Sequence, residues 1–264
     1  MNLTLTKPVN IHLTGCSAVI FYFLIWTICR LEESRRKLVN LVVKLGHFLF
    51  PYPPKPRALR DYARIFETLH SEGYGLVLVA GGGAASRGYI EALRRLHADE
   101  TVCDEAGISV SRLNARLMAV ALGELAYPAV PRSLEELRAY SRHGRIVVMG
   151  GLTPGHSTAA VGALAAEALN ADIYIMATDV DGIYSEDPKA DPKARKFEEV
   201  TTGKLLELAL KGKLWAGTYQ LDPLAVKIIE RSGVTAYFLD GRRKENIMRA
   251  SLGGKVGTKI VPGS

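Results

Sequence analysis

The chain of 264 residues is about half apolar, which is enough to bury one substantial core as one or two domains. Its formal net charge of +7 lies in residues 1–60, which hold nine Lys or Arg and two Glu. The whole chain has 34 Lys or Arg and 27 Asp or Glu, so residues 61–264 hold 25 of each sign. The remaining chain is neutral and lacks the basic stripe of a nucleic-acid-binding protein. The three cysteines, Cys16, Cys29 and Cys103, have no C-x-x-C spacing and support neither a disulfide framework nor a zinc site. We therefore expect a reducing, cytoplasmic location.

The first 37 residues are predicted to form an N-terminal extension, separate from a domain over residues 38–264. Residues 11–29 are an apolar run of 19 residues, close to the roughly 20 needed to span a bilayer, and basic residues follow from Arg30 to Lys37. Three interpretations stay open: translation that begins further on, a membrane anchor, or a hydrophobic extension docked on the domain. Contact with a membrane is expected only under the second.

After Lys37, short β-rich runs alternate with longer amphipathic segments, which is the pattern of a parallel sheet flanked by helices. The predicted fold class is therefore α/β. Strands are predicted at residues 38–45, 75–80, 145–149, 173–178, 235–239 and 258–261. Helices are predicted at residues 57–72, 83–96, 110–122, 158–169, 203–211, 223–232 and 244–252.

Three of the strands end in glycine-rich or polar turns, and open α/β sheets bind ligands outside the carboxyl ends of their strands. The first turn is Gly81-Gly82-Gly83, whose backbone can come within contact distance of a ligand because it has no β-carbons. The helix that follows offers N–H groups and a positive dipole end to a phosphate, and Arg87 can grip phosphate oxygens with two N–H groups. The alternative to a phosphate site is a tight strand-to-helix turn that binds no ligand, next to an arginine exposed to solvent.

The second turn, residues 150–158, combines two glycines, a Pro-Gly pair and hydroxyl groups at a helix N-terminus that Ser157 caps. Its N–H and O–H donors suit a small ligand. His156 is a candidate general base, but a lone histidine more often orients other groups or lies in a core, so no proton transfer is assigned to it.

The third turn is Thr178-Asp-Val-Asp-Gly-Ile-Tyr-Ser-Glu-Asp-Pro188, in which a strand ends in a hydroxyl group and two carboxylates. Its alternating acids resemble a calcium loop, but a strand and a loop flank it instead of two helices, and the terminal Glu spacing is absent. A nucleotide pocket suits these residues better. Tyr184 can pack on a base or ribose, and the acids can hold Mg²⁺ through water.

These turns, in this order, resemble the amino-acid kinase superfamily and, within it, the archaeal UMP kinases. The resemblance rests on VAGGGAASRGYI, Asp104–Ile108 with Ser111–Ala115, VVMGGLTPGHSTAAV, ATDVDGIYSEDP and AGTYQLDPLAVKIIERSG. It covers the chain from about Leu41 onward and implies a three-layer α/β/α sandwich with a mainly parallel sheet. It also implies an ATP:UMP phosphotransferase that acts with Mg²⁺, as a cytoplasmic homohexamer.

The resemblance implies roles for individual residues. The implied UMP contacts are Gly82, Asp104, Leu152, Thr153, Pro154, Gly155, His156, Ser157 and Thr158. The implied ATP contacts are Gly46, His47, Gly83, Arg87, Thr178, Asp179, Tyr184 and Asp187. Asp104 is expected to accept hydrogen bonds from ribose hydroxyl groups, and no residue is assigned as a direct metal ligand.

The segment Lys44-Leu-Gly-His-Phe48 departs from the family pattern, in which a lysine is followed by a Gly-Gly-Ser or Ser-Gly-Lys turn. One residue is missing, and His47 or Phe48 stands where a small or basic residue is usual. We expect Lys44 to be the catalytic residue, neutralising charge on the transferred phosphoryl group, with the turn at Gly46 and His47.

Two alternatives remain at this point. Related enzymes phosphorylate acetylglutamate, carbamate, aspartate or isopentenyl phosphate on the same scaffold. The altered turn after Lys44 also leaves open a non-catalytic nucleotide-binding protein for storage or sensing.

Overall fold

The computed structural model describes residues 40–186, 191, 193–210, 215–216 and 219–263. The predicted N-terminal extension, residues 1–37, lies outside these ranges, as does Asp187 of the predicted ATP site. Within the described ranges, no helix is both long enough and apolar enough to cross a bilayer.

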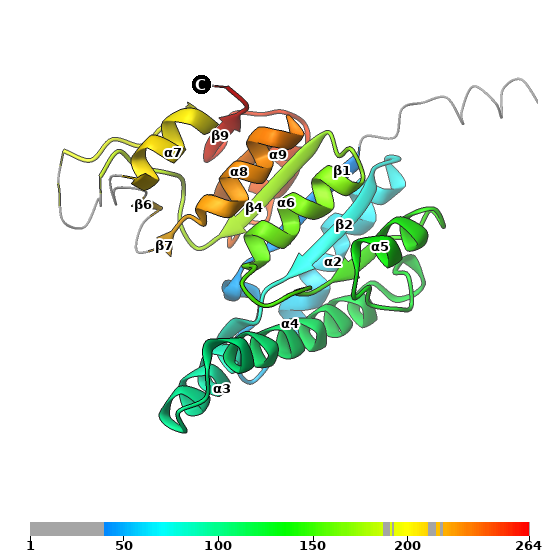
Figure 1. The fold of residues 1–264 in the computed structure, drawn as a ribbon. Coiled ribbons are helices and arrows are strands. Elements are labelled where there is room, and N and C mark those ends of the chain that lie inside the picture. Colours follow the sequence, from blue (N-terminus) through cyan, green and yellow to red (C-terminus); the bar gives the residue numbers. More distant parts are fainter. Residues whose placement is uncertain (1–39, 187–190, 192, 211–214, 217–218, 264) are drawn as a thin grey trace, which may run out of the picture. The chain divides into compact units, whose positions relative to one another are not determined.

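Seven strands of the described chain form one sheet, in the order β3-β2-β1-β4-β8-β9-β5 (Figure 1). Their bounds are β1 (Asn40–Leu45), β2 (Gly75–Ala80), β3 (Val147–Met149), β4 (Ile173–Thr178), β5 (Glu199–Thr201), β8 (Thr235–Asp240) and β9 (Thr258–Val261). β9 runs antiparallel to β8, and the other neighbouring pairs are parallel. A separate antiparallel pair is formed by β6 (Trp215–Ala216) and β7 (Tyr219–Gln220). The predicted mainly parallel sheet is therefore confirmed.

Helices cover both faces of this sheet (Figure 1). One face carries α5 (Leu134–Ser141), α6 (Thr158–Ala168), α7 (Thr202–Leu210) and α8 (Pro223–Ser232). The other face carries α2 (Pro56–Ser71), α4 (Glu100–Leu122) and α9 (Glu245–Ser251). Helix α3 (Gly83–Arg95) packs along α4, and η1 (His47–Leu49) and η2 (Gly123–Leu125) are short 3₁₀ turns. This is the predicted three-layer sandwich.

Strand β1 shows how the two cores arise. Alternate residues of a strand point to opposite faces, so Leu41, Val43 and Leu45 join the core beneath α2 and α9, while Val42 joins the core beneath α6 and α8. Both faces are covered, and the strand therefore reads as an almost continuous apolar run. Lys44 is the exception, a charged residue at the carboxyl end of a buried central strand.

The predicted start of α4 at residue 110 is wrong, because the helix begins at Glu100. Asp99 caps it, and its side chain accepts a hydrogen bond from the Val102 N–H at 3.0 Å. The first turns contain β-branched residues and Gly107, which have weak helix propensity. The sequence pattern therefore did not predict a helix over residues 100–109. The sequence also failed to predict α5, β5 and the β6–β7 pair, all of which are short elements.

Gly162 of α6 lies against Tyr174 of β4, so we predict that Gly162→Ala destabilises the fold. A β-carbon there would stand 2.5 Å from the Tyr174 hydroxyl oxygen. The Tyr174 side chain is fully buried, and its hydroxyl group donates to the Ala159 carbonyl oxygen at 2.8 Å. Overpacking of this kind costs about 1–3 kcal/mol, which outweighs the helix-propensity gain of about 1 kcal/mol.

Urea denaturation of the two single variants Gly162→Ala and Gly88→Ala checks this prediction. Gly88 is an exposed glycine in α3 whose β-carbon would meet nothing within 4 Å, so that control is expected to be neutral or slightly stabilising. Equal stability changes in the two variants would contradict the prediction.

Candidate active site

Three glycines lie at the carboxyl edge of the sheet and continue its hydrogen bonding beyond the strands. The Gly46 N–H donates to the Ala177 carbonyl at 2.9 Å, the Gly81 N–H to Leu45 at 3.1 Å, and the Gly241 N–H to Thr178 at 2.8 Å. A β-carbon on Gly46 would stand 2.7 Å from the Ala177 oxygen, and one on Gly241 would stand 2.6 Å from the Ala177 β-carbon. These edge glycines (Gly46, Gly81 and Gly241) therefore bring the turns of β1, β2 and β8 against their neighbouring strands.

The first glycine turn is held from two sides. Asn114 of α4 is buried, and its Nδ2 donates to the carbonyl oxygens of Gly81 at 2.8 Å and of Gly82 at 3.1 Å. Gly83 has φ of +67°, and a β-carbon there would stand 2.2 Å from the Phe50 oxygen. The turn thus has one fixed backbone geometry, at the start of α3.

The second turn is also held by α4. Ser111 Oγ accepts from the Gly151 N–H at 2.8 Å, and Arg112 Nε donates to the Gly151 carbonyl at 3.0 Å. Nearer the start of the helix, the Asp104 carboxylate accepts from the Gly155 N–H at 2.7 Å. Gly150 allows this approach, because its β-carbon would stand 2.6 Å from the Arg112 backbone nitrogen. One helix therefore sets the distance between both turns.

A cavity of about 150 Å³ lies between the two turns and α4. Its lining residues are Gly82, Ser86, Asp104, Gly107, Ile108, Ser111, Gly151, His156 and Thr158. The buried Nδ1 of His156 has no hydrogen-bond partner among the described residues. A buried polar atom without a partner costs free energy, so a ligand that pairs with it would be favoured.

Lys44 lies at the end of β1, with only 6% of its surface exposed. Burial lowers its pKa from the usual 10.5 to about 8, although the nearby Asp179 carboxylate acts in the opposite direction. The site therefore holds a protonated lysine at neutral pH that is poorly solvated. Such a cation is well suited to meet the negative charge of a ligand.

The turn after Lys44 is formed by Gly46 and His47, the two residues predicted for it. Gly46 fits because no β-carbon can be placed there, and His47 Nε2 lies 3.3 Å from the Asp179 Oδ2. Phe48 turns away, and its ring packs against Tyr62 with the centroids 5.8 Å apart. The structure therefore brings His47 toward the third turn, while the partly buried Phe48 packs against the core.

The third turn follows β4. Thr178 is buried and its Oγ1 accepts from the Val180 N–H at 3.2 Å. Tyr184 donates to Asp181 Oδ1 at 2.9 Å, and Lys196 pairs with Asp181 Oδ2 at 3.2 Å. Burial alone would raise the pKa of Asp181, but the bonds from Tyr184 and Lys196 outweigh it and the pKa is lowered. The Asp181 carboxylate is thus ionised, and it holds the loop.

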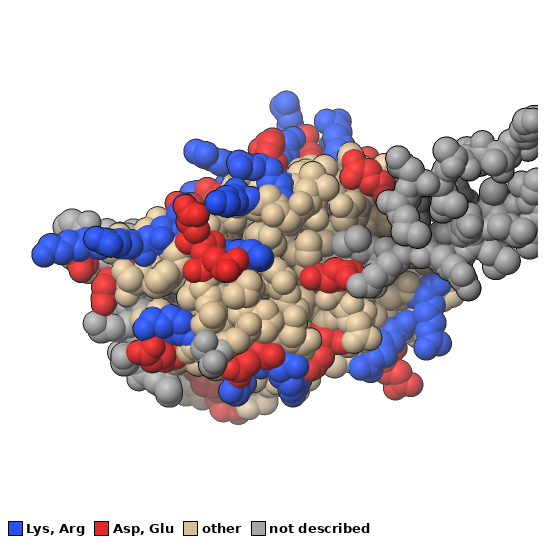
Figure 2. All heavy atoms as spheres, turned by 90° about the horizontal axis from the view of Figure 1, so that it is seen from above, with Lys and Arg blue, Asp and Glu red and all other residues tan. Residues whose placement is uncertain are grey.

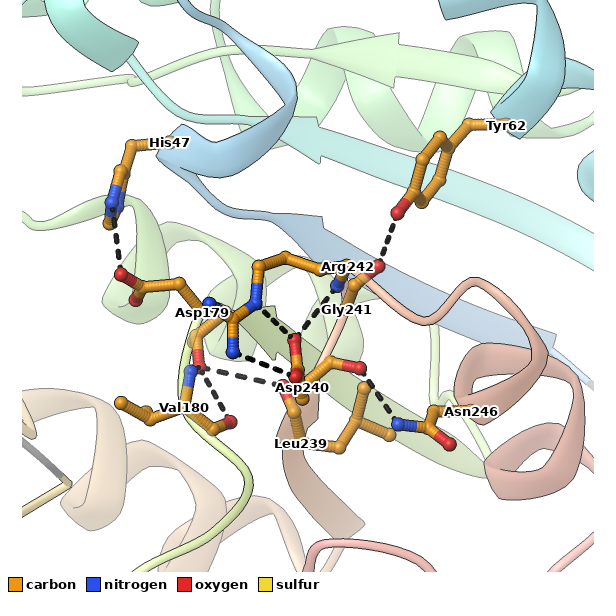
Figure 3. A network of polar contacts seen from close by, with 10 residues as sticks. His47, Tyr62, Asp179, Val180, Leu239, Asp240, Gly241, Arg242 and Asn246 are labelled. Carbon is orange, nitrogen blue, oxygen red and sulfur yellow. Dashed lines mark hydrogen bonds and ion pairs between the residues drawn. The ribbon is translucent and has the colours of Figure 1, made fainter. Parts of the chain in front are cut away.

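A polar network joins this turn to the one after β8 (Figure 3). Arg242 Nε and Nη2 each donate to the Asp240 carboxylate at 2.9 Å. These bonds lower the pKa of Asp240 and raise that of Arg242. Tyr62 of α2 donates to the Gly241 carbonyl, and burial is the main cause that raises its pKa to about 12. Sequence inspection did not single out these residues.

The residues predicted to contact UMP fall into two groups. Gly82, Asp104, His156 and Thr158 line the cavity. The others share the β3–α6 loop with His156 but are not among its lining residues: Leu152, Thr153, Pro154, Gly155 and Ser157. Ser157 caps α6, with its Oγ accepting from the Ala160 N–H at 3.1 Å. Arg87 lies one turn into α3 with an exposed side chain.

The sequence missed the roles of Ser111 and Asn114, although a signal for them exists. From Asp104 onward, positions 104, 107, 108, 111 and 114 share one helical face, and this is the face that meets the turns. With the helix predicted only from residue 110, that periodicity could not be seen.

Comparison with known proteins agrees with this geometry. Residues 40–240 match the amino acid kinase family. A uridylate kinase of Methanothermobacter thermautotrophicus is 42% identical over 225 residues, which cover 85% of this chain and all of that protein. A uridylate kinase of Hyperthermus butylicus is 43% identical over 211 residues, covering 79% of this chain and 92% of that protein. The chain belongs to the amino acid kinase family, and within it to the uridylate kinases.

Solved structures agree. The crystal structure of uridylate kinase from Archaeoglobus fulgidus superposes with a TM-score of 0.76 at 40% identity, covering 84% of this chain and 99% of that one. A UMP kinase from Bacillus anthracis superposes with a TM-score of 0.73 at 18% identity, covering 87% of this chain and 98% of that one, and supports the fold alone. The predicted family is confirmed, and kinase activity with ATP implies a divalent metal ion.

Because Lys44 is buried as a cation, we predict that Lys44→Met raises the free energy of unfolding at pH 7. A shift from 10.5 to about 8 corresponds to a cost on the order of 3 kcal/mol. Below about pH 8 the folded and unfolded chains both carry the proton, and the cost is complete. Between about 8 and 10.5 the unfolded chain binds more protons, so wild-type stability rises with pH and the gain from the substitution shrinks.

Chemical denaturation at pH 7 and pH 9 measures this difference. Lys227→Met in α8 is the control, since the Lys227 side chain is 66% exposed and its loss should change stability little at either pH. A Lys44→Met protein less stable than wild type at pH 7 would contradict the buried-cation account.

Proposed function

We propose that the chain transfers the γ-phosphoryl group of ATP to UMP, giving ADP and UDP for pyrimidine nucleotide biosynthesis. The observation that carries this proposal is the cavity between two glycine turns that α4 holds side by side, at the same sheet edge as buried Lys44. Relatives that are 42% and 43% identical over the aligned residues are uridylate kinases. A site for an acceptor phosphate beside a site for a donor triphosphate is what this reaction requires.

UMP is proposed to occupy the cavity. Asp104 has acceptor capacity beyond its bond to Gly155 and is placed to receive ribose hydroxyl groups, because a carboxylate has about four acceptor positions. The N–H groups of Gly82 and of the loop from Leu152 to Thr158 are proposed to bind the remaining polar groups of UMP. His156 is proposed to bind and orient, without moving a proton.

ATP is proposed to lie over β4 and β8, where Thr178, Asp179 and Tyr184 are found. Its γ-phosphate would then point toward β1, near Lys44 and the Gly46-His47 turn, with Gly83 and Arg87 on the acceptor side. The sheet order supports this division, because β2 and β3 carry the acceptor turns on one side of β1 while β4 and β8 lie on the other. Asp187, also proposed here by resemblance, lies outside the described residues.

Transfer across β1 leaves the protein little covalent work. A phosphate oxygen of UMP is already ionised at neutral pH and attacks in line, so positioning and electrostatic stabilisation do most of the work. The buried Lys44 ammonium group and the glycine N–H groups are proposed to neutralise charge that develops on the moving phosphoryl group. No general base is required.

Mg²⁺ is proposed as the divalent ion. Among the described residues, no group of three or more His, Cys, Asp or Glu side chains could hold a metal ion. Mg²⁺ commonly keeps several waters and binds through one or two carboxylates together with substrate phosphates, and the half-exposed Asp179 carboxylate fits this donor set. When bound, the ion would neutralise phosphate charge, and Asp179 would hold one of its waters.

We predict that the purified chain releases ADP rapidly with UMP and at least tenfold more slowly with CMP, isopentenyl phosphate or acetylglutamate. A coupled ADP assay with chromatographic detection of UDP measures this.

Lys44→Met should lower turnover about 100-fold or more, as expected for removal of a principal electrostatic group. ADP release with another acceptor alone would refute the proposed substrate, and near-normal turnover of Lys44→Met would refute the role of Lys44.

The chain is also proposed to act in the cytoplasm as a homo-oligomer, with a hexamer suggested by family resemblance. An apolar stripe on α4 supports association, because Leu113, Leu117 and Val120 follow helical spacing and are 60%, 39% and 74% exposed. Both signs of charge are interspersed on the face seen in Figure 2, so no basic surface for a nucleic acid is seen on that face.

Sedimentation velocity should show an oligomer at micromolar concentration, and we predict that Val120→Glu shifts it to smaller species. Leu252→Glu is the control, since Leu252 is 67% exposed after α9 and away from the stripe. A monomeric wild-type protein, or equal effects of the two substitutions, would contradict the role of the stripe.

A further inference from the structure

Arg242 is held in one orientation although its side chain is 58% exposed. The mostly buried Asp240 carboxylate accepts from Nε and Nη2 of its guanidinium and, at 3.0 Å, from its backbone N–H. Asn246 Nδ2 of α9 donates a hydrogen bond to the Asp240 carbonyl at 2.9 Å, and the Tyr62 hydroxyl group of α2 donates one to the Gly241 carbonyl. Three elements thus fix a turn that ends in an exposed cation.

The strength of the ion pair does not explain this arrangement. A pair with a largely exposed arginine typically adds little to the stability of a fold. Asp240 uses two of the five guanidinium N–H donors, and within the described chain no other acceptor takes the rest. A pre-oriented guanidinium with spare donors is suited to bind an oxyanion.

The position of Arg242 decides which oxyanion this could be. β8 pairs with β4 through Thr178 and Asp240, and the Gly241 N–H donates to Thr178, so the Arg242 turn adjoins the Asp179 turn. Figure 3 shows the Arg242 side chain extending from the β8 turn toward the segment of Asp179 and Val180. The bond to Asp240 is the main cause of the raised pKa of Arg242, and Asp179 and Asp181 add smaller contributions in the same direction, which places the guanidinium in their field.

The acceptor turns lie on the far side of β1. β8 is two strands from β1, and neighbouring strands lie about 4.8 Å apart, so the acceptor cavity beside β2 and β3 is well beyond an arginine side chain. The donor nucleotide, proposed to lie over β4 and β8, is within reach.

We propose that Arg242 binds the β- and γ-phosphates of the donor nucleotide and that Asp240 is the positioning residue that orients it. This rests on the proposed donor site over β4 and β8. Lys44 would meet the triphosphate from β1 and Arg242 from β8, with Asp179 between them.

The test uses the full chain and four single variants: Arg242→Gln, Arg242→Lys, Asp240→Asn and Arg243→Gln. Arg243 is the matched control, because it is the adjacent exposed arginine and carries the same charge. Steady-state kinetics at saturating UMP gives KM for ATP, and kinetics at saturating ATP gives KM for UMP. Titration calorimetry gives the affinities for ATP, ADP and AMP without turnover.

Arg242→Gln is expected to raise KM for ATP at least tenfold while KM for UMP changes less than twofold. ATP and ADP affinities should fall at least fivefold, but AMP affinity should not change, because AMP lacks the phosphates concerned. Arg242→Lys should recover part of the loss. Asp240→Asn should shift the ATP parameters in the same direction, and Arg243→Gln should stay within twofold of wild type.

Loss of thermal stability in Arg242→Gln with unchanged ATP and ADP affinity would overturn the proposal and leave Arg242 a turn-stabilising residue. A change confined to KM for UMP would overturn it as well. If the wild type binds ATP but phosphorylates no acceptor, the proposed function fails, yet the ATP, ADP and AMP affinities of the variants still decide the role of Arg242.

Discussion

The candidate site depends on hydrogen bonds that continue the sheet past the ends of its strands. The edge glycines, each the first residue after β1, β2 or β8, donate to carbonyl groups in the last two residues of the neighbouring strands. A side chain at Gly46 or Gly241 would collide with Ala177, so larger residues would push these turns apart. Because the bonds link β2 to β1, β1 to β4, and β8 to β4, the proposed acceptor and donor turns are fixed relative to each other.

Helix α4 adds a second constraint on the acceptor side. Its polar face binds carbonyl oxygens of the first turn through Asn114 and both polar groups of Gly151 through Ser111 and Arg112. The turns are therefore shaped before a ligand arrives, and a ligand in the cavity need not supply the energy to order them. Helix α4 also carries the apolar stripe on its exposed face, so association of subunits through that stripe would stiffen the same helix.

Much of the fold could be predicted from the sequence because strands buried on both faces are continuous apolar runs, and such runs mark β1, β2, β4 and β8 clearly. The glycine and acid turns that follow them mark the edge where the site lies. The start of α4 was missed since its first turns have weak helix propensity, and with it the shared face of Asp104 and Ser111. The Asp240–Arg242 pair was missed because nothing in Asp-Gly-Arg-Arg distinguishes a held arginine from a solvated one.

The charges at the donor side explain why acids accompany the cations there. Lys44 is buried and would lose its proton more readily without Asp179, whose negative charge opposes the effect of burial on the lysine pKa. Arg242 is permanently charged, and Asp240 fixes where that charge points. The two acids therefore have different tasks: Asp179 favours the charged form of Lys44, and Asp240 keeps the Arg242 guanidinium in place. An incoming triphosphate would take over the first task, because its own charge favours the protonated lysine, and Asp179 would then be available to hold a hydrated metal ion.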